Sequence, residues 1–149
     1  MKKIVFLDID GVVQTISFRD DNSIYLSGQT PIVGNANYYL NDYCISLLNS
    51  LKFITGAEFV LSSSWRRRAE DFRSIQLSLP YLNIVNYTEV RMDEDRVRDI
   101  RRYLRSHRPD KFVVIDDIDM RGYFGKNMIW CKNYSFDKKL YESAIDILS

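Results

Sequence analysis

The fold is decided by the stretch Lys3-Ile4-Val5-Phe6-Leu7-Asp8-Ile9-Asp10-Gly11, in which a short apolar run ends in two carboxylates and a glycine. The apolar part is rich in β-branched and aromatic side chains, which is typical of a buried strand in a parallel sheet. Asp8 then lies at the carboxyl end of the strand, where open α/β sheets bind ligands. Because strand side chains alternate between faces, Asp8 and Asp10 face one site while Ile9 points into the core.

Two other interpretations of this carboxylate motif compete with a reactive site. An Asp pair can simply end a strand and begin a turn. Asp-x-Asp-Gly also opens an EF-hand loop, but the later ligand positions of such a loop fall on Val12, Ile16 and Arg19, which carry no carboxylate. Two neighbouring carboxylates at a buried strand end are costly unless a metal or a reaction uses them, so we favour the catalytic interpretation.

The composition predicts a single domain over residues 1–149. With 46% hydrophobic residues, a chain of 149 residues can bury a sizeable core without disulfide bonds or a structural metal ion. Cys44 and Cys131 have no zinc-site or disulfide spacing, and no stretch resembles a signal peptide or a membrane span, so we expect a cytoplasmic protein without a membrane partner. The formal net charge is only +1, but residues 64–111 carry 12 Lys and Arg against 8 Asp and Glu and form the candidate basic surface.

Strand and helix patterns alternate along the chain, which predicts an α/β fold with a doubly wound parallel sheet. Strands are expected at 3–7, 59–61, 111–115 and, more weakly, 83–85 and 127–131, and helices at 39–54, in a short segment through Phe72, from Asp93 and at 138–148. Residues 14–38 combine Ser, Asn, Gly and Pro with alternating residues such as Ser23-Ile24-Tyr25-Leu26, which predicts a small flap or minimal cap.

Three of the expected strands end in polar side chains of complementary kinds. The first ends in Asp8 and Asp10, the second in Ser62-Ser63-Ser64, and the third in Asp116-Asp117, with an arginine-rich helix start between the last two. Transfer of a phosphoryl group needs a nucleophile, hydroxyl donors, a cation that holds the phosphoryl oxygens, and a magnesium ion on carboxylate oxygens. The strand ends supply these groups, although at least one of the serines is also expected to cap a helix.

On these motifs the sequence resembles the phosphatases of the haloacid dehalogenase (HAD) superfamily. The matching positions are Asp8 to Val12 for the first motif, Ser62 or Ser63 for the second, Arg96, with Arg91 and Arg98 as alternatives, for the third, and Asp116-Asp117 for the fourth. The hexapeptide from Leu61 to Arg66 is similar to one in the small phosphatase-like domains of bacterial and viral RNA repair proteins. The resemblance implies a three-layer, Rossmann-like HAD fold with a central parallel sheet.

The resemblance also implies a magnesium-dependent phosphomonoesterase that acts through an aspartyl-phosphate. Asp8 is then the nucleophile, while Asp10 protonates the leaving oxygen and later deprotonates the attacking water. The expected phosphate ligands are Ser62, Ser63 and Arg96, and the expected Mg²⁺ ligands are Asp8, the Asp10 backbone carbonyl, Asp117 and Asp116. Because carboxylates this close raise each other's pKa, the cation is needed to keep Asp8 ionised.

The spacing of the motifs indicates the size of the substrate. Too few residues separate Arg66 from Arg96 for a large cap domain, and a site without one does not by itself enclose a small metabolite. We therefore expect a large phosphorylated substrate, such as an RNA or DNA end with a 3′-phosphate. Arg66, Arg67 and Arg68 are candidates to guide that strand, although such runs more often face solvent. A small-molecule nucleotide phosphatase and a non-catalytic module that binds magnesium or phosphate stay open as alternatives.

Overall fold

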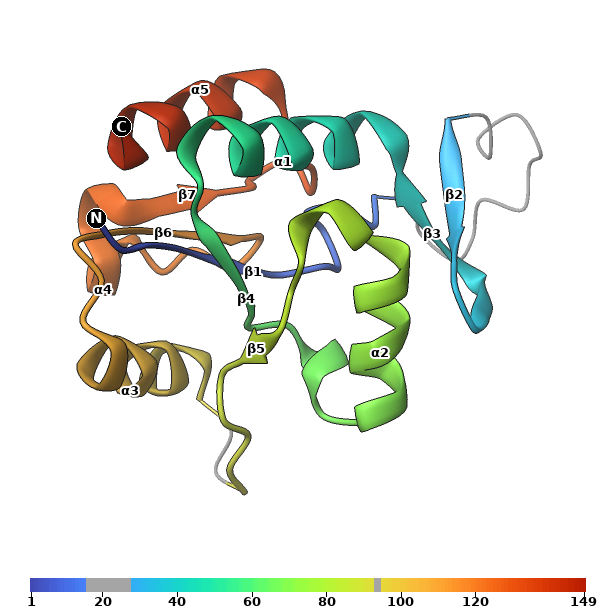
Figure 1. The fold of residues 1–149 in the computed structure, drawn as a ribbon, viewed down its shortest axis with the longest axis horizontal. Helices are drawn as coiled ribbons and strands as arrows, with labels where there is room; N and C mark the ends of the chain where they lie inside the picture. The colour runs from blue at the N-terminus through green and yellow to red at the C-terminus, as the bar shows by residue number, and fades with distance from the viewer. Residues whose placement is uncertain (16–27, 93–94) are drawn as a thin grey trace.

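The computed structural model describes residues 1–15, 28–92 and 95–149 (Figure 1). Within these residues, five parallel strands form a sheet in the order β5-β4-β1-β6-β7. The strands are β1 (Lys3–Leu7), β4 (Glu58–Leu61), β5 (Asn86–Tyr87), β6 (Lys111–Asp116) and β7 (Met128–Trp130). The expected α/β fold with a central parallel sheet is confirmed.

Strand β1 lies in the middle of the sheet because its side chains from Ile4 to Leu7 are apolar and are buried on both faces. It pairs with β4 on one side and β6 on the other, so that Leu7 is level with Leu61 and Ile115. The chain leaves β1 to build β4 and β5 on one side, and then crosses back to build β6 and β7 on the other. The carboxyl end of β1 is therefore a topological switch point, where such sheets bind ligands.

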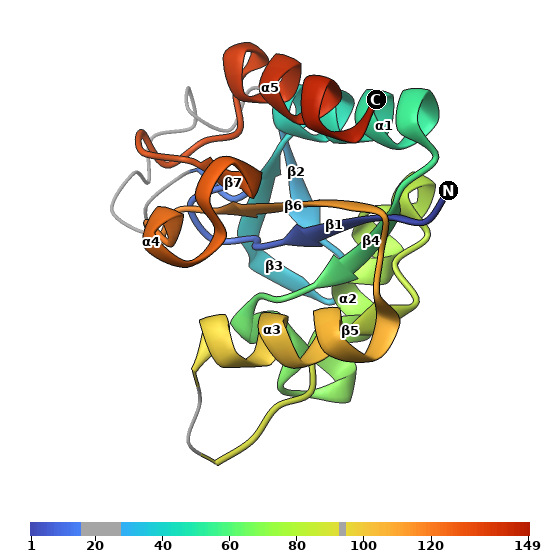
Figure 2. The ribbon, with the colours of Figure 1, turned by 90° about the vertical axis from the view of Figure 1, so that its left-hand side faces the viewer.

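Helices cover both faces of the sheet and give the fold three layers (Figure 2). The helices are α1 (Asp42–Thr55), α2 (Ala69–Ser78), α3 (Arg96–His107), α4 (Arg121–Phe124) and α5 (Lys138–Leu148). On one face, Leu48 of α1, Ile75 of α2 and Leu148 of α5 join the larger apolar core. On the other face, Ile100 of α3 and Phe124 of α4 join the smaller one.

An antiparallel hairpin made of β2 (Gln29–Ile32) and β3 (Asn35–Asn41) precedes α1. Its end is fixed to the turn that follows Asp8 and Asp10, because the backbone N–H of Asn41 donates to the Val13 carbonyl at 2.8 Å. The Asn41 side chain also accepts from the backbone N–H of Cys44 at 3.0 Å and so caps α1. This hairpin lies where the flap is expected, whereas residues 23–26 lie outside the described residues.

Two of the expected elements are displaced along the chain. The helix expected at 39–54 begins at Asp42, because the preceding residues continue the hairpin. The expected strand at 83–85 is wrong, since the strand there is β5 at 86–87. Asn83 has a left-handed backbone with φ of 50°, which ends the short 3₁₀ helix η3 (Pro80–Leu82) and delays the strand.

The two helices on either side of β5 differ from the expectation at their ends. The helix expected to end near Phe72 continues to Ser78 as α2. Helix α3 begins at Arg96 with Asp95 as its N-cap, while Asp93 lies outside the described residues. None of the helices in the described ranges combines the length and the apolar character that crossing a membrane requires.

Candidate active site

Asp8 and Asp10 follow β1 directly, and their carboxylates lie in different environments. The backbone N–H of Asp8 donates to the Ile115 carbonyl at 3.0 Å, which continues the pairing with β6, and the Asp8 side chain is buried. Asp10 is exposed, and its Oδ1 accepts a hydrogen bond from the Trp65 indole N–H at 3.2 Å. Ile9 between them is fully buried, as the alternation predicts. One strand end thus presents a buried carboxylate and an accessible one.

Gly11 brings the turn after β1 close to the end of β6. Its φ is 78°, a left-handed conformation that residues with a side chain rarely adopt. A Cβ atom at this position would lie 2.5 Å from Oδ2 of Asp117. Any side chain at position 11 would therefore displace the Asp117 carboxylate from its present position.

The carboxyl end of β6 places two more acidic residues beside Asp8. Among the described residues, Asp8, Asp116 and Asp117 form a cluster in which one carboxylate oxygen of each lies within 4.8 Å of the others. Asp116 is fully buried, and its Oδ1 accepts from the backbone N–H of Ile118 at 2.9 Å. Hard divalent cations prefer such carboxylate oxygens. The Asp10 side chain is outside this described cluster, and the metal role predicted for Asp10 concerns its backbone carbonyl.

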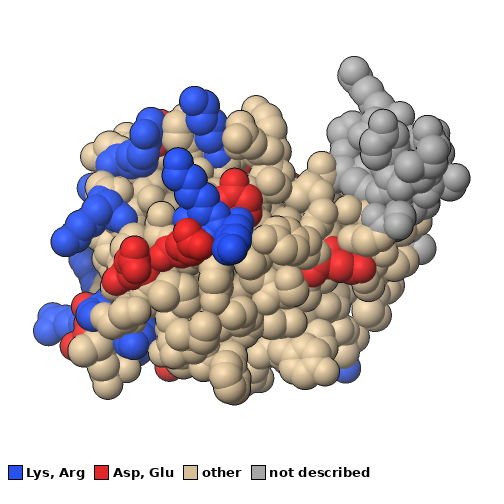
Figure 3. Space-filling model, turned by 90° about the horizontal axis from the view of Figure 1, so that it is seen from above, with Lys and Arg blue, Asp and Glu red and all other residues tan. Residues whose placement is uncertain are grey.

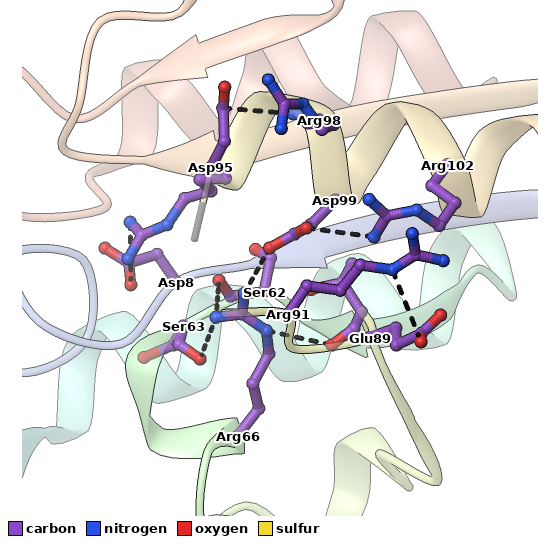
Figure 4. Close-up of polar contacts among 12 residues, drawn as sticks. Asp8, Ser62, Ser63, Arg66, Glu89, Arg91, Asp95, Arg98, Asp99 and Arg102 are labelled. Atoms are coloured by element: carbon purple, nitrogen blue, oxygen red, sulfur yellow. Dashed lines mark hydrogen bonds and ion pairs between the residues drawn. The ribbon is translucent and has the colours of Figure 1, made fainter. Parts of the chain in front are cut away.

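Arg96 joins the acidic cluster from the first turn of α3. Its Nη1 lies 2.9 Å from Oδ2 of Asp116 and 3.6 Å from Oδ1 of Asp8. The two alternatives for the third motif make other contacts: Arg91 forms an ion pair with Glu89 at 3.6 Å, and the backbone N–H of Arg98 donates to the N-cap residue Asp95 at 3.2 Å (Figure 4). Of the three arginines, the structure brings Arg96 to the predicted nucleophile.

Burial and mutual repulsion shift the ionisation of this cluster. Burial raises the pKa of Asp8 well above its usual range, and the charge of Asp116 raises it further while Arg96 opposes both. Burial also raises the pKa of Asp116 to about 6, against the effect of Arg96. Burial would lower the pKa of Arg96, but the charges of Asp8 and Asp116 outweigh it and raise that pKa. Arg96 therefore leaves part of the negative charge uncompensated.

The pKa of Asp10 is shifted in the direction that suits an acid. Burial of part of the carboxyl group raises the pKa of Asp10, while the hydrogen bond from Trp65 opposes the shift. A raised pKa keeps a larger fraction of the group protonated near neutral pH, as a general acid requires. The Trp65 bond occupies Oδ1 and orients the carboxyl group.

The predicted phosphate ligands Ser62 and Ser63 follow β4, and their hydroxyl groups differ. The Ser62 backbone N–H donates to the Leu7 carbonyl at 3.0 Å, so Ser62 lies next to the end of β1. Its Oγ is buried and has no hydrogen-bond partner among the described residues. The Ser63 Oγ accepts from the Trp65 backbone N–H at 3.3 Å and caps the short 3₁₀ helix η2 (Ser64–Arg66). A buried hydroxyl without a partner is costly, which marks Ser62 as the one available to a ligand.

Arg66 has a structural role that the sequence does not reveal. Its guanidinium is buried and donates to the carbonyls of Thr88 at 3.0 Å, Ser62 at 3.0 Å and Ser63 at 2.8 Å, and it pairs with Asp99 of α3 at 2.9 Å (Figure 4). Its treatment as a member of an exposed basic run is wrong, because these contacts remove it from the surface. Arg67 and Arg68 beside it are exposed.

A small open pocket leads to the accessible carboxylate. It has a volume of about 230 Å³ and lies between Asp10 and the hairpin, which contributes Asn35 and Tyr38. Trp65 forms another wall, and its ring meets that of Tyr38 edge to face at 5.4 Å between centroids. The hairpin therefore flanks the site and supplies part of its wall.

One of three comparisons with known proteins finds a match for this chain. A family model described as the HAD domain in Swiss Army Knife RNA repair proteins matches residues 4–136. The match covers the ends of β1, β4 and β6, and the arginine at the start of α3. No match was found among curated proteins or among solved structures.

Proposed function

Because this chain belongs to the family of HAD domains in Swiss Army Knife RNA repair proteins, we propose that it is a phosphomonoesterase that forms an aspartyl-phosphate on Asp8. The observation that carries the proposal is the position of Asp8, buried at the carboxyl end of the central strand with its Oδ1 3.6 Å from Arg96. The Ser62 hydroxyl at the neighbouring strand end, which has no partner among the described residues, gives the second support.

The proposed reaction has two displacements at phosphorus. In the first, an oxygen of the Asp8 carboxylate attacks the phosphorus atom, the bond to the leaving oxygen breaks, and Asp10 gives its proton to that oxygen. In the second, Asp10 takes a proton from water, whose oxygen attacks the phosphorus and releases the Asp8 carboxylate and inorganic phosphate. The Trp65 bond to Oδ1 leaves Oδ2 of Asp10 for both proton transfers. Arg96 and Ser62 hold the phosphoryl oxygens during both steps.

The residues fit a magnesium ion. The cluster of Asp8, Asp116 and Asp117 offers carboxylate oxygens within 4.8 Å of one another, and Arg96 alone compensates only part of their charge. These three residues, with the Asp10 backbone carbonyl, would hold the ion. When bound, Mg²⁺ supplies positive charge that keeps Asp8 ionised and offsets the charge on the phosphoryl oxygens.

We further propose that the substrate is a phosphorylated macromolecule, in the first place an RNA or DNA end with a 3′-phosphate. The family description supports this choice, since it places such domains in RNA repair proteins. The pocket between Asp10 and the hairpin supports this choice as well, because among the described residues it opens to the surface, where the end of a long substrate can enter. Small-molecule nucleotidase activity is the second candidate, favoured only by the limited volume of that pocket.

The basic test is hydrolysis of an aryl phosphate by the purified protein with and without Mg²⁺. We expect activity that excess chelator abolishes, and an Asp8→Asn variant that loses at least about 10⁴-fold in kcat because the nucleophile is gone. Circular dichroism of the variant provides the control that the fold is intact. Full activity in chelator would contradict the proposal, and a complete lack of hydrolysis would favour the non-catalytic binding module.

The proposed role of Asp10 is tested with two leaving groups. Asp10→Asn should reduce kcat for an alkyl phosphate by about 10² to 10⁴-fold, because an alkoxide needs a proton as it leaves. The loss for an aryl phosphate should be much smaller, since a phenolate leaves without one. Trp65→Phe is the companion variant: it removes the hydrogen bond to Asp10 and keeps an aromatic ring, although a smaller one, at this buried position. Equal losses of Asp10→Asn on both substrates would mean that Asp10 is no acid in this reaction.

A further inference from the structure

A second depression, larger than the pocket beside Asp10, lies next to Arg96. It has a volume of about 670 Å³ and lies between the start of α3 and the loop that leads from β6 into α4. Arg96 and Arg98 line one wall, and Ile118, Asp119 and Tyr123 line the other. We call it the α3–α4 groove. Because Arg96 also contacts Asp8, the groove begins at the proposed catalytic site.

The walls of the groove combine exposed apolar surface with positive charge. Ile118 and Tyr123 are 51% and 59% exposed, although both are large apolar side chains. The guanidinium of Arg101 lies over the Tyr123 ring, 5.2 Å from its centroid. Arg101 covers one face of the ring, so a nucleobase can stack on the opposite face while a phosphate meets the guanidinium.

A stripe of arginines continues from the groove along α3. Arg98, Arg101 and Arg105 are exposed and follow one another at intervals of three and four residues, so they lie on one face of the helix. The stripe extends about 10 Å along the helix axis. Such a row of guanidinium groups suits the repeated phosphates of a single nucleic-acid strand.

The other basic candidates are less suitable. Arg66, which the sequence places in the basic run after the serines, is buried against Asp99. The face covered by α1 and α5 carries both signs, with Asp and Glu among its Lys and Arg (Figure 3). Within the groove, the exposed Asp119 carboxylate is paired with Arg121 at 2.8 Å, and Asp95 caps α3. The stripe of arginines on α3, in contrast, continues directly from the α3–α4 groove.

We propose that the α3–α4 groove and the arginine stripe bind the single-stranded nucleic acid behind its terminal phosphate. The nucleotide next to the phosphate stacks on Tyr123, and the preceding phosphates follow Arg98, Arg101 and Arg105. This inference rests on the proposed function, because it assumes that the phosphate itself lies at Asp8. It assigns the path of the strand to α3 and not to Arg67 and Arg68 after β4.

The kinetic test compares two sets of variants on two substrates. The triple variant Arg98→Ala, Arg101→Ala, Arg105→Ala should lower kcat/KM by about tenfold or more on a single strand of about ten nucleotides with a 3′-phosphate. It should leave hydrolysis of an aryl phosphate unchanged. The matched control is Arg67→Ala, Arg68→Ala, which also removes exposed arginines but lies on the other side of the site. This control should retain most of the activity on the oligonucleotide.

The aromatic platform is tested separately at Tyr123. Tyr123→Ala should lower kcat/KM on the oligonucleotide by about tenfold, because stacking on the ring is lost. Tyr123→Phe keeps the ring and should behave like the unchanged protein. Neither variant should affect the aryl phosphate.

A binding experiment keeps this inference independent of catalysis. In the Asp8→Asn protein, anisotropy of a labelled oligonucleotide should show a Kd that rises with salt. Removal of the three arginines should reduce the slope of log Kd against log salt by about 2, at about 0.7 for each phosphate that the protein no longer neutralises. This readout stands even if no phosphatase activity is found, so failure of the proposed function is recognised separately.

Three outcomes would overturn the inference. The first is a loss on the oligonucleotide with Arg67→Ala, Arg68→Ala that equals or exceeds the loss with the α3 variants. The second is an equal loss of the α3 variants on the aryl phosphate, which would mean damage to the site itself. The third is a salt slope that the arginine substitutions leave unchanged.

Discussion

Two arginines near the carboxyl edge of the sheet, Arg66 and Arg96, meet acidic groups in opposite proportions. Arg66 is 1% exposed and pairs with Asp99, whose other oxygen accepts from Arg102 at 3.2 Å, so positive charge is in excess there. Arg96 contacts both Asp8 and Asp116, and Asp117 lies next to them, so negative charge is in excess. The contacts of Arg66 pair its charge without a ligand. The cluster around Arg96 keeps excess negative charge, which a bound cation would compensate.

The same residue types, arginine and aspartate, thus have a structural role at one place on this edge of the sheet and a proposed reactive role at another. A buried pair that satisfies its own hydrogen bonds holds chain segments together. A buried cluster of uncompensated carboxylates shifts its pKa values and attracts cations. The two arginines should therefore respond differently to substitution, to pH and to magnesium.

The largest effect on stability is expected at Arg66. Arg66→Met should lower the free energy of unfolding by about 3 kcal/mol, because it leaves Oδ2 of the buried Asp99 and the carbonyls of Ser62, Ser63 and Thr88 without the Arg66 donor, while Arg102 still contacts Oδ1. Arg66→Lys should recover little, since an ammonium group cannot match the planar fork. The measurement is urea unfolding, with Arg67→Met as the exposed control. Wild-type stability in Arg66→Met would show that the two arginines do not differ in this way.

The acidic cluster should make the metal-free protein less stable as the pH rises. The pKa of Asp116 is about 6 in the folded protein against an ordinary value of 3.8, so the folded state binds this proton more tightly than the unfolded chain does. The free energy of unfolding should then fall by about 2 kcal/mol between about pH 4 and pH 7. The raised pKa of Asp8 acts in the same direction.

This pH dependence is measured by urea unfolding in chelator across that range, with Asp116→Asn as the control. The variant should lose the part of the fall that comes from Asp116, because its side chain does not ionise, and should keep the part that burial of Asp8 causes. Added Mg²⁺ should stabilise the unchanged protein more at pH 7 than at pH 5, since the carboxylates are then ionised. Stability that rises through this range in both proteins would contradict the idea of uncompensated charge.

The smallest effects are expected at the two serines, and they should separate structure from function. Ser63→Ala should lower the free energy of unfolding by about 1 kcal/mol, because it removes the cap of η2, and should change activity little. Ser62→Ala should leave stability unchanged or raise it, since its buried hydroxyl has no partner among the described residues. It should lower kcat by about tenfold or more. A loss of activity in Ser63→Ala but not in Ser62→Ala would identify Ser63 as the phosphate ligand.

The sequence predicts the strand ends well because their signals are local. An apolar run of four or five residues that changes abruptly to Asp or Ser identifies the ends of β1, β4 and β6, and parallel strands bring such ends to one edge. The sequence therefore predicts that Asp8, Asp116 and Ser62 lie at the same edge of the sheet. Arg96 is one of three arginines that the resemblance allows for the third motif, and its contact with Asp8 is what distinguishes it from Arg91 and Arg98.

The parts that the sequence does not predict depend on contacts between distant residues. Nothing near Arg66 separates it from Arg67 and Arg68, and its partner Asp99 lies on another helix. The α3–α4 groove is equally hidden, since it joins α3 to a loop that follows a different strand. The displaced strand at 86–87 depends on the left-handed backbone of Asn83, which no apolar pattern reveals.

The contacts of Arg66 also determine the spacing of the groups around the proposed phosphate site. One guanidinium joins the carbonyls of Ser62 and Ser63 to Asp99, which lies on the same helix as Arg96. Arg66 thus connects the segment that carries the Ser62 hydroxyl to the helix that carries the Arg96 guanidinium. The distance between these groups is therefore set when the chain folds, so in the proposed reaction the two sides of the phosphate site are arranged before a tetrahedral group binds.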